Sequence, residues 1–316
     1  MGFPVIRAFS ATFAYLMRHG ADLLKALWLP VGLIVALQLY VMPSFFSSLS
    51  SIIALGENPE PSEAASALGD LAKWGLVLTA GSAIAYPMIT VASLRHVVRG
   101  DELKAPFYLR YGGDELRVLA AYILISIMVI LISVVGGLGA TIVVMVLTLV
   151  APQARQLLSV IGEFAVNLVS VWFRVRLATL YPASLATGTI GFGAAWASTK
   201  GSAWSLFFFF VLVGLALLPF AVLVMAPFAG EFFPHFRRLA EAGQDTLAAR
   251  EALIPMLDAF GKLYSPENPS FALFVPLLFV STLVSSAVLN VASGIAWRFL
   301  TDGGPGRQAA AQSIAA

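Results

Sequence analysis

The residues with the most chemical potential lie inside an apolar stretch between positions 157 and 183. Glu163, Asn167, Ser170 and Arg174 are spaced by four, three and four residues, which places them on one helical face at about 100° per residue. A carboxylate within an apolar span is costly and usually faces a bundle interior or a cavity. Two interpretations follow. One is an ion or proton path that runs inward from Glu163; the other is packing and hydrogen bonding between helices, with Arg174 reaching the aqueous boundary.

A second row of small and polar residues lies in the last apolar stretch. Thr282, Ser286, Asn290 and Gly294 follow one another at intervals of four residues. Side chains of this kind, at this spacing, let helix backbones approach and hydrogen-bond to each other. We therefore expect a packing face, and the alternative is a polar lining shared with the helix that carries Glu163.

Basic residues form two further groups that could bind anionic lipid headgroups. The candidate contacts are Arg95, Arg99, Lys104, Arg110, Arg176 and Lys200, and Arg174 accompanies the last two. Acidic neighbours reduce the net charge of the first group, namely Asp101, Glu102, Asp114 and Glu115. The alternative is that these cations only set the orientation of the protein in the membrane.

Motifs for nucleotide, metal and hydrolytic chemistry are missing from the sequence. The segment GTIGFG (188–193) has glycines, but it follows an apolar helix and lacks the lysine and serine of a P-loop. His19, His96 and His235 are isolated, and the first two are expected across the bilayer from the third, so we interpret each as a solvated interfacial residue. The chain contains no cysteine and no GxSxG elbow. We therefore expect no catalytic, cofactor or metal site, and no enzyme.

The elements that must position these residues are membrane spans. The chain of 316 residues is 59% hydrophobic and 11% charged, and its mean hydropathy is +0.88. Soluble domains are about 45–50% apolar and about 25% charged. The net charge of +2 gives no argument for nucleic acid as a partner. The sequence predicts an all-α, polytopic membrane protein that forms a single domain over residues 1–316.

Six spans are expected, at about 24–48, 72–94, 116–135, 157–183, 203–228 and 270–297, because each crossing needs about 20 mostly apolar residues. The third apolar stretch continues to Val150. Gly136, Gly137 and Gly139 favour a break there, so we expect residues 138–150 to form a kinked extension or a short re-entrant half-helix. In this topology thirteen of the 19 Lys and Arg residues lie on the side of the N-terminus, which places both termini in the cytoplasm. Residues 301–316 are expected to form a flexible tail.

The largest hydrophilic segment, about 231–268, is expected on the outer side. Leu253, Met256, Leu257 and Phe260 form an apolar stripe at helical spacing. We expect an amphipathic helix on the membrane surface, and the alternative is a docking platform for another protein.

A short pattern recurs in which an aromatic residue, a glycine five positions later and a large apolar residue three positions after that precede a span. It occurs at Trp196, Gly201 and Trp204, and a shift of 88 residues aligns 98–116 with 186–204 without a gap. The other copies are Tyr108, Gly113 and Leu116, and Tyr15, Gly20 and Leu23. We interpret each copy as a cytoplasmic elbow, in which a short interfacial helix ends at a glycine in the left-handed conformation. This predicts a parallel repeat of about 72–150 and 157–228. It also predicts three hairpins with approximate threefold pseudosymmetry, which requires contact between spans one and six.

Residues 172–206 resemble a loose group of six-span bacterial inner-membrane proteins of uncharacterised function, related to the membrane domain beside some glycerophosphodiester phosphodiesterases. The features that carry the resemblance are Arg174, Arg176, Pro182, Ala195-Trp196, Thr199-Lys200-Gly201 and Trp204. The resemblance implies a six-span fold in the bacterial inner membrane. It brings no catalytic residues, since the phosphodiesterase barrel has no counterpart in this sequence.

These observations lead us to expect a non-enzymatic scaffold, assembly or lipid-organising protein. Its expected partners are the lipid bilayer, anionic headgroups and other membrane proteins. The alternative is a transporter of a small solute, ion or lipid that uses the polar faces around Glu163 and Asn290.

Overall fold

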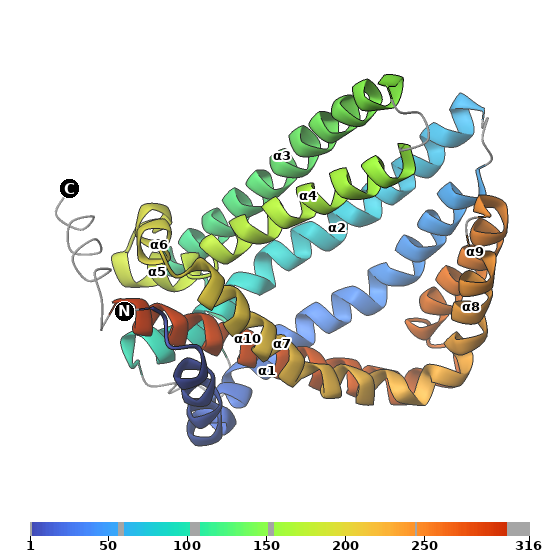
Figure 1. Cartoon of the computed structure of the whole chain (residues 1–316). Helices are drawn as coiled ribbons and strands as arrows, with labels where there is room; N and C mark the ends of the chain where they lie inside the picture. The colour runs from blue at the N-terminus through green and yellow to red at the C-terminus, as the bar shows by residue number, and fades with distance from the viewer. Residues whose placement is uncertain (1, 56–59, 102–107, 151–154, 244, 302–316) are drawn as a thin grey trace.

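The computed structural model describes residues 2–55, 60–101, 108–150, 155–243 and 245–301, and the regular elements within them are helical (Figure 1). The long helices are α1 (Val5–Ala54), α2 (Pro61–Leu94), α3 (Gly113–Val150), α4 (Arg155–Arg176), α7 (Ala203–Met225) and α10 (Phe271–Thr301). The shorter elements are the π-helical turn η1 (Arg95–Arg99), α5 (Leu180–Thr187), α6 (Phe192–Ser198), the 3-10 turn η3 (Ala226–Phe228), α8 (Ala229–Ala242) and α9 (Thr246–Leu263). Six helical segments are long and apolar enough to cross a membrane, one for each expected span, and they indicate a multi-pass membrane protein. Lys104 and residues 302–316 of the expected tail lie outside the described residues.

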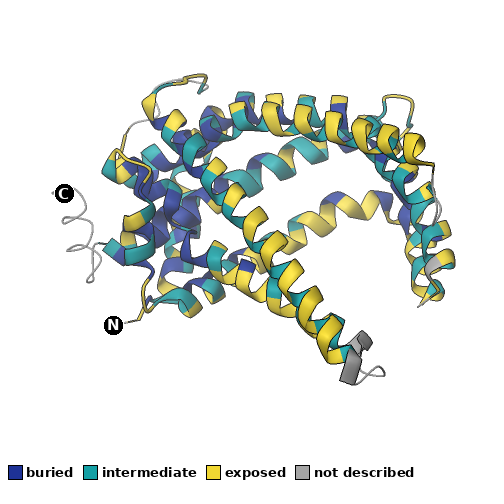
Figure 2. Ribbon diagram, turned by 90° about the horizontal axis from the view of Figure 1, so that it is seen from above, coloured by how far each residue is buried: buried dark blue, intermediate teal, exposed yellow. Residues whose placement is uncertain are grey.

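The helices pack together at the end of the molecule where both termini lie. Figure 2 shows that buried residues gather there, and we call this end the hub. It contains apolar clusters whose fully buried members include Leu23, Leu94, Ala121 and Val291. At the opposite end α9 packs on α1, and α8 packs on α9 (Figure 1). Much of the core therefore lies at the hub, and a smaller cluster that includes Phe232, Leu263 and Phe274 lies at the opposite end.

Three pairs of long helices account for much of the remaining packing. Helix α1 lies against both α2 and α10, and Val31 of α1 shares an apolar cluster with Leu283 of α10. Spans one and six are therefore in contact, as the hairpin arrangement requires, while the internal repeat and its pseudosymmetry stay predictions. Helices α3 and α4 pack on each other and form an arm whose residues beyond the hub are mostly exposed (Figure 2).

Residues 138–150 extend the third helix, which is one of the two expected arrangements, but the expected break at the glycines is absent. Helix α3 continues without interruption through Gly136, Gly137 and Gly139 to Val150. The glycines serve packing instead: a Cβ on Gly136 would lie 3.2 Å from the Val166 side chain of α4. Glycine at such a position lets two helices approach closely. A helix longer than the apolar layer is accommodated by tilting, so no re-entrant turn is needed.

Two prolines leave backbone carbonyls that the loop before α3 satisfies. Pro30 has no N–H to offer the carbonyl of Ala26, and the backbone N–H of Tyr108 donates to that oxygen at 3.0 Å. Pro87 similarly frees the carbonyl of Ala83, which accepts from the Tyr111 hydroxyl at 3.5 Å. One short segment therefore ties α1 to α2 at the two points where proline opens their hydrogen-bond ladders.

The expected elbows agree with the structure at one glycine and fail at two. Gly201 precedes α7 with a φ of 79°. Gly20 lies inside α1 and Gly113 begins α3, and neither has a positive φ. Ala, Leu, Met, Arg and Lys around Gly20 are good helix formers, so one glycine does not interrupt α1.

The fourth span also ends earlier than expected. Helix α4 stops at Arg176, a short turn follows, and α5 begins only at Leu180. Helix α5 ends at Gly188, which has a φ of 70°. The expected span 157–183 is therefore divided between two helices.

The apolar stripe of the outer segment packs inside the protein and not on lipid. Met256 and Leu257 of α9 are buried, and the ring of Phe260 stacks on Phe46 of α1 with centroids 5.8 Å apart. Gly261 also faces α1, where an added Cβ would lie 3.6 Å from the Pro43 carbonyl oxygen, at ordinary contact distance. Helix α9 is therefore a cap on α1.

Candidate functional site

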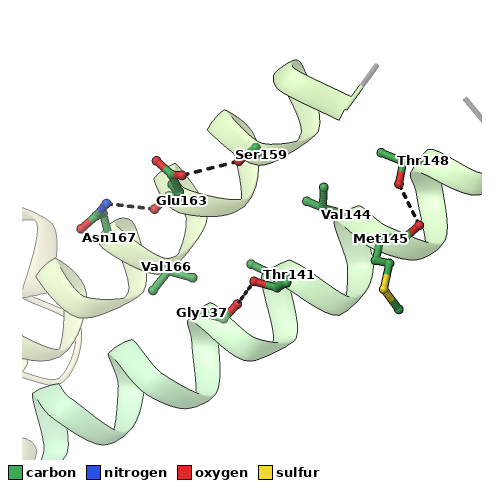
Figure 3. Close-up of a pocket in the computed structure, with 10 residues that line it drawn as sticks. Gly137, Thr141, Val144, Met145, Thr148, Ser159, Glu163, Val166 and Asn167 are labelled. Carbon is green, nitrogen blue, oxygen red and sulfur yellow. Dashed lines mark hydrogen bonds between the residues drawn. The ribbon is translucent and has the colours of Figure 1, made fainter. Parts of the chain in front are cut away.

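The polar face of α4 opens into a groove between α3 and α4. The groove has a volume of about 670 Å³ and lies toward the outer end of the arm (Figure 3). Its lining is Gly137, Ala140, Thr141, Val144, Met145, Thr148, Ser159, Glu163, Val166 and Asn167. Two helices thus supply every lining residue, and the carboxylate of Glu163 is the charged group among them.

Most polar groups in the groove are satisfied by the helix that carries them. Asn167 donates through Nδ2 to the backbone carbonyl of Glu163 at 3.0 Å, and Thr141 donates to the carbonyl of Gly137 at 2.9 Å. The carboxylate of Glu163 accepts a single long hydrogen bond, 3.5 Å from the Ser159 hydroxyl (Figure 3). The Glu163 side chain is exposed, so its oxygens can accept further hydrogen bonds from a ligand.

The rest of the predicted α4 face does not continue the groove. Ser170 is buried, and its hydroxyl donates to the carbonyl of Val166 at 3.0 Å. Arg174 is exposed, near the hub end of the helix. The groove therefore holds Glu163 and Asn167, while Ser170 and Arg174 lie beyond it.

The polar row of span six lies elsewhere. Thr282 and Ser286 are half-buried, and Asn290 is buried in the hub. A Cβ on Gly294 would lie 2.7 Å from Val97 of η1, so α10 packs closely there. No residue of α10 lines the α3–α4 groove in the described part of the chain.

Three further polar residues of these regions are absent from the sequence prediction. Ser159 stands four residues before Glu163, so helical spacing alone could have added it. Thr141 comes from α3 and is brought to the groove only by the packing of the two helices. Ser293 donates to the carbonyl of Ala178 at 2.7 Å and joins α10 to the turn after α4.

One buried carboxylate binds two arginines of the first basic group. Asp114, whose side chain is 7% exposed, binds Arg99 at 2.8 Å and Arg117 at 2.6 Å, and it also pairs with Arg95. Arg99 donates a further hydrogen bond to the carbonyl of Leu185 at 2.5 Å. The predicted headgroup contacts Arg95 and Arg99 are therefore structural residues of the hub, whereas Arg110 is exposed.

The second basic group, Arg174, Arg176 and Lys200, contains one buried and two exposed cations. Arg176 is buried, its guanidinium lies over the Trp196 ring at 4.3 Å, and it donates to the Trp196 carbonyl at 2.9 Å. Lys200 and Arg174 are exposed. Within the described residues neither of these two side chains forms an ion pair with an acid.

A buried carboxylate beside the Asp114 cluster is bound by the loop that ties α1 to α2. Glu115 is fully buried and accepts from the Tyr108 hydroxyl at 2.5 Å and from the backbone N–H of Gly112 at 2.7 Å. Burial, followed by the hydrogen bond to Glu115, raises the pKa of Tyr108, so the phenol stays protonated as the donor at neutral pH.

The substitution Tyr108→Phe is expected to lower the free energy of unfolding by about 2 kcal/mol, because it removes a hydrogen bond to a buried carboxylate. Chemical unfolding of the purified protein in detergent measures the change. Tyr111→Phe is the matched control. Tyr111 is in the same loop, but it is 41% exposed and its hydroxyl makes only a long hydrogen bond of 3.5 Å to the Ala83 carbonyl. Equal losses in the two variants would contradict this role of the Tyr108 hydroxyl.

The histidines are not isolated as expected. The rings of His19 and His96 lie 4.7 Å apart in the hub, and the Tyr15 hydroxyl is hydrogen-bonded to Nδ1 of His96. The contact joins α1 to η1 over a sequence separation that no local pattern reports. Among the described residues no group of three or more His, Cys, Asp and Glu side chains is arranged to hold a metal ion.

Comparison with known proteins gives this chain no relative from which a role could be transferred: no family model, no curated protein and no solved structure matches it.

Proposed function

We propose that this protein is a non-enzymatic scaffold of the bacterial inner membrane, with both termini in the cytoplasm, whose α3–α4 arm engages another membrane component. The observation that carries the proposal is the separation of the two polar faces. Glu163 and Asn167 line a groove of two helices on the arm, whereas Asn290 is packed in the hub. This placement favours an attachment surface over a path through the molecule.

The chemistry of the groove favours a helix of another membrane protein as the partner. Glu163 is an exposed acceptor between apolar neighbours on α4, with Phe164 66% and Val160 59% exposed beside it. In a bilayer such a carboxylate is stabilised by donors from a second helix. A helix that presents Ser, Thr, Asn or Lys fits this acceptor.

Site-specific crosslinking tests the scaffold proposal. Because the chain contains no cysteine, Asn167→Cys and Phe164→Cys each introduce a single thiol for a photoactivatable crosslinker. We expect defined membrane-protein adducts from position 167 in native membranes, and few from position 164, which faces away from the groove. Adding Glu163→Gln to Asn167→Cys should lower the adduct yield at least about threefold, because it removes a charged acceptor between helices. Equal yields at both positions would contradict the proposal.

The transporter alternative is favoured by the size of the groove and by its carboxylate. It requires water to continue along α4 beyond the groove. Single cysteines at positions 163, 167, 170 and 174 can be labelled with a membrane-impermeant thiol reagent from each side. The scaffold proposal predicts that labelling of the groove positions stops before 170, because Ser170 is buried. Labelling that includes position 170 would indicate a hydrated path and favour transport.

A further inference from the structure

A second groove lies on the opposite face of α4, where this helix meets α7. It is lined by Leu168, Val171, Trp172, Val175, Ala203, Trp204 and Phe207, which are all apolar or aromatic. On α4 these positions recur every three or four residues, and none of them lines the groove that contains Glu163. The α4–α7 groove is therefore a separate site at the hub end of the arm.

The charged residues of the chain segment that forms this groove are all positive. The sequence contains no Asp or Glu between Glu163 and Glu231, and Arg174, Arg176 and Lys200 are the basic residues of this segment. The guanidinium of Arg176 lies over the Trp196 ring, whereas Arg174 and Lys200 are exposed. In contrast, Arg95 and Arg99 of the first basic group converge on Asp114. In the second group, two exposed cations adjoin an apolar groove.

Both exposed cations lie close to the residues that line the groove. Arg174 is three residues from Val171, so the two side chains are neighbours on the surface of α4. Lys200 follows Thr199, whose hydroxyl donates to the Arg176 carbonyl at 3.0 Å, and it precedes Ala203 of the groove by three residues. Trp204 is 64% exposed at the same end and can lie at headgroup depth.

We infer that the shallow α4–α7 groove, whose volume is about 40 Å³, seats part of one acyl chain of an anionic phospholipid whose phosphate is bound by Arg174 and Lys200. The apolar walls cover that part of the chain, and the guanidinium and ammonium groups bind the phosphate oxygens. Arg176 is a positioning residue, because its guanidinium stacks on Trp196 and lies 5.8 Å from the ring of Trp172 in the groove wall. This site is independent of the partner helix proposed at Glu163, so either proposal can fail alone.

Native mass spectrometry of the full chain, with phosphatidylglycerol or phosphatidylcholine added, tests the inference. The double substitution Arg174→Gln and Lys200→Gln is expected to weaken phosphatidylglycerol binding roughly 10- to 30-fold, given the contribution of each cation near a membrane surface. The matched control is Arg7→Gln with Arg18→Gln, which removes two exposed charges from α1. We expect the control to bind phosphatidylglycerol as the native chain does.

Two further measurements separate a lipid site from general attraction of anions. Inorganic phosphate should not displace the bound phosphatidylglycerol, because it cannot occupy the apolar groove. Binding of phosphatidylcholine should be weak and unaffected by the double substitution. The inference is overturned if the double variant binds phosphatidylglycerol as well as the native chain does. Equal losses in the Arg7 and Arg18 control, or displacement by inorganic phosphate, would overturn it as well.

Discussion

Asp114→Asn will lower the free energy of unfolding by about 3 kcal/mol, because it removes the carboxylate on which three arginines of the hub converge. The Asp114 side chain is 7% exposed, and that of Arg95 is 17% exposed. Arg99 and Arg117 are more open to solvent, at 33% and 37%, so solvent screens part of their repulsion. The loss is nevertheless large, since the guanidiniums stay close together without a counterion. Chemical or thermal unfolding of the purified protein in detergent, followed by circular dichroism, measures this loss.

Asp101→Asn is the charge-matched control for this experiment. Asp101 lies two residues after the π-helical turn η1, which carries Arg95 and Arg99, but its side chain is exposed. A surface substitution of this kind changes stability by no more than about 0.5 kcal/mol. If the Asp101 variant lost as much stability as the Asp114 variant, net charge and not the buried cluster would be responsible.

Gly191→Ala will destabilise the hub by about 3 kcal/mol or more, because a left-handed backbone and a steric clash occur at the same residue. Gly191 has a φ of 65°, and a Cβ on it would lie 2.6 Å from the backbone nitrogen of Ser184 and 2.8 Å from the carbonyl carbon of Ala183. These atoms belong to α5 and cannot rotate away as a flexible side chain can. The hydroxyl of Ser184 donates to the Ile190 carbonyl at 2.6 Å, which fixes the loop against α5.

Two neighbouring glycines separate the causes of this effect. Gly188 has a φ of 70° with nothing within 4 Å of an added Cβ, so Gly188→Ala should cost only the conformational part, about 1 kcal/mol. Gly193 lies inside α6 with open space around it, and Gly193→Ala should be neutral or stabilising by up to about 1 kcal/mol. Similar stabilities of the Gly191 and Gly193 variants would refute the clash.

Hydropathy was sufficient to predict the spans, and the errors have a common physical cause. Each expected span corresponds to one long apolar helical segment, although α1 begins at Val5, well before residue 24, and a turn divides the fourth segment after Arg176. The break at Gly136 was wrong because in lipid no water replaces a broken backbone hydrogen bond, so the helix continues through glycine. The left-handed glycines expected at Gly20 and Gly113 were wrong because α1 continues through Gly20 and α3 begins at Gly113.

The candidate sites could be predicted only as faces of single helices. Spacing placed Glu163 and Asn167 together, and the structure shows that they line one groove. Spacing could not show that α3 provides the opposite wall through Thr141, or that Asn290 belongs to the hub. These relations depend on which helices pack together, and no local pattern encodes that choice.

By itself the sequence determined that the chain is helical, apolar and multi-pass, and where its charges stand along each helix, because hydropathy and helical periodicity act over a few residues. Only the tertiary structure decided which charges are free. It brings Asp114 to Arg95 and Arg99 and leaves Arg174 and Lys200 without an acidic partner among the described residues. It also joins His19 to His96. The reason is that ion pairs and grooves form between residues far apart in the chain, and their partners are fixed only when the helices pack.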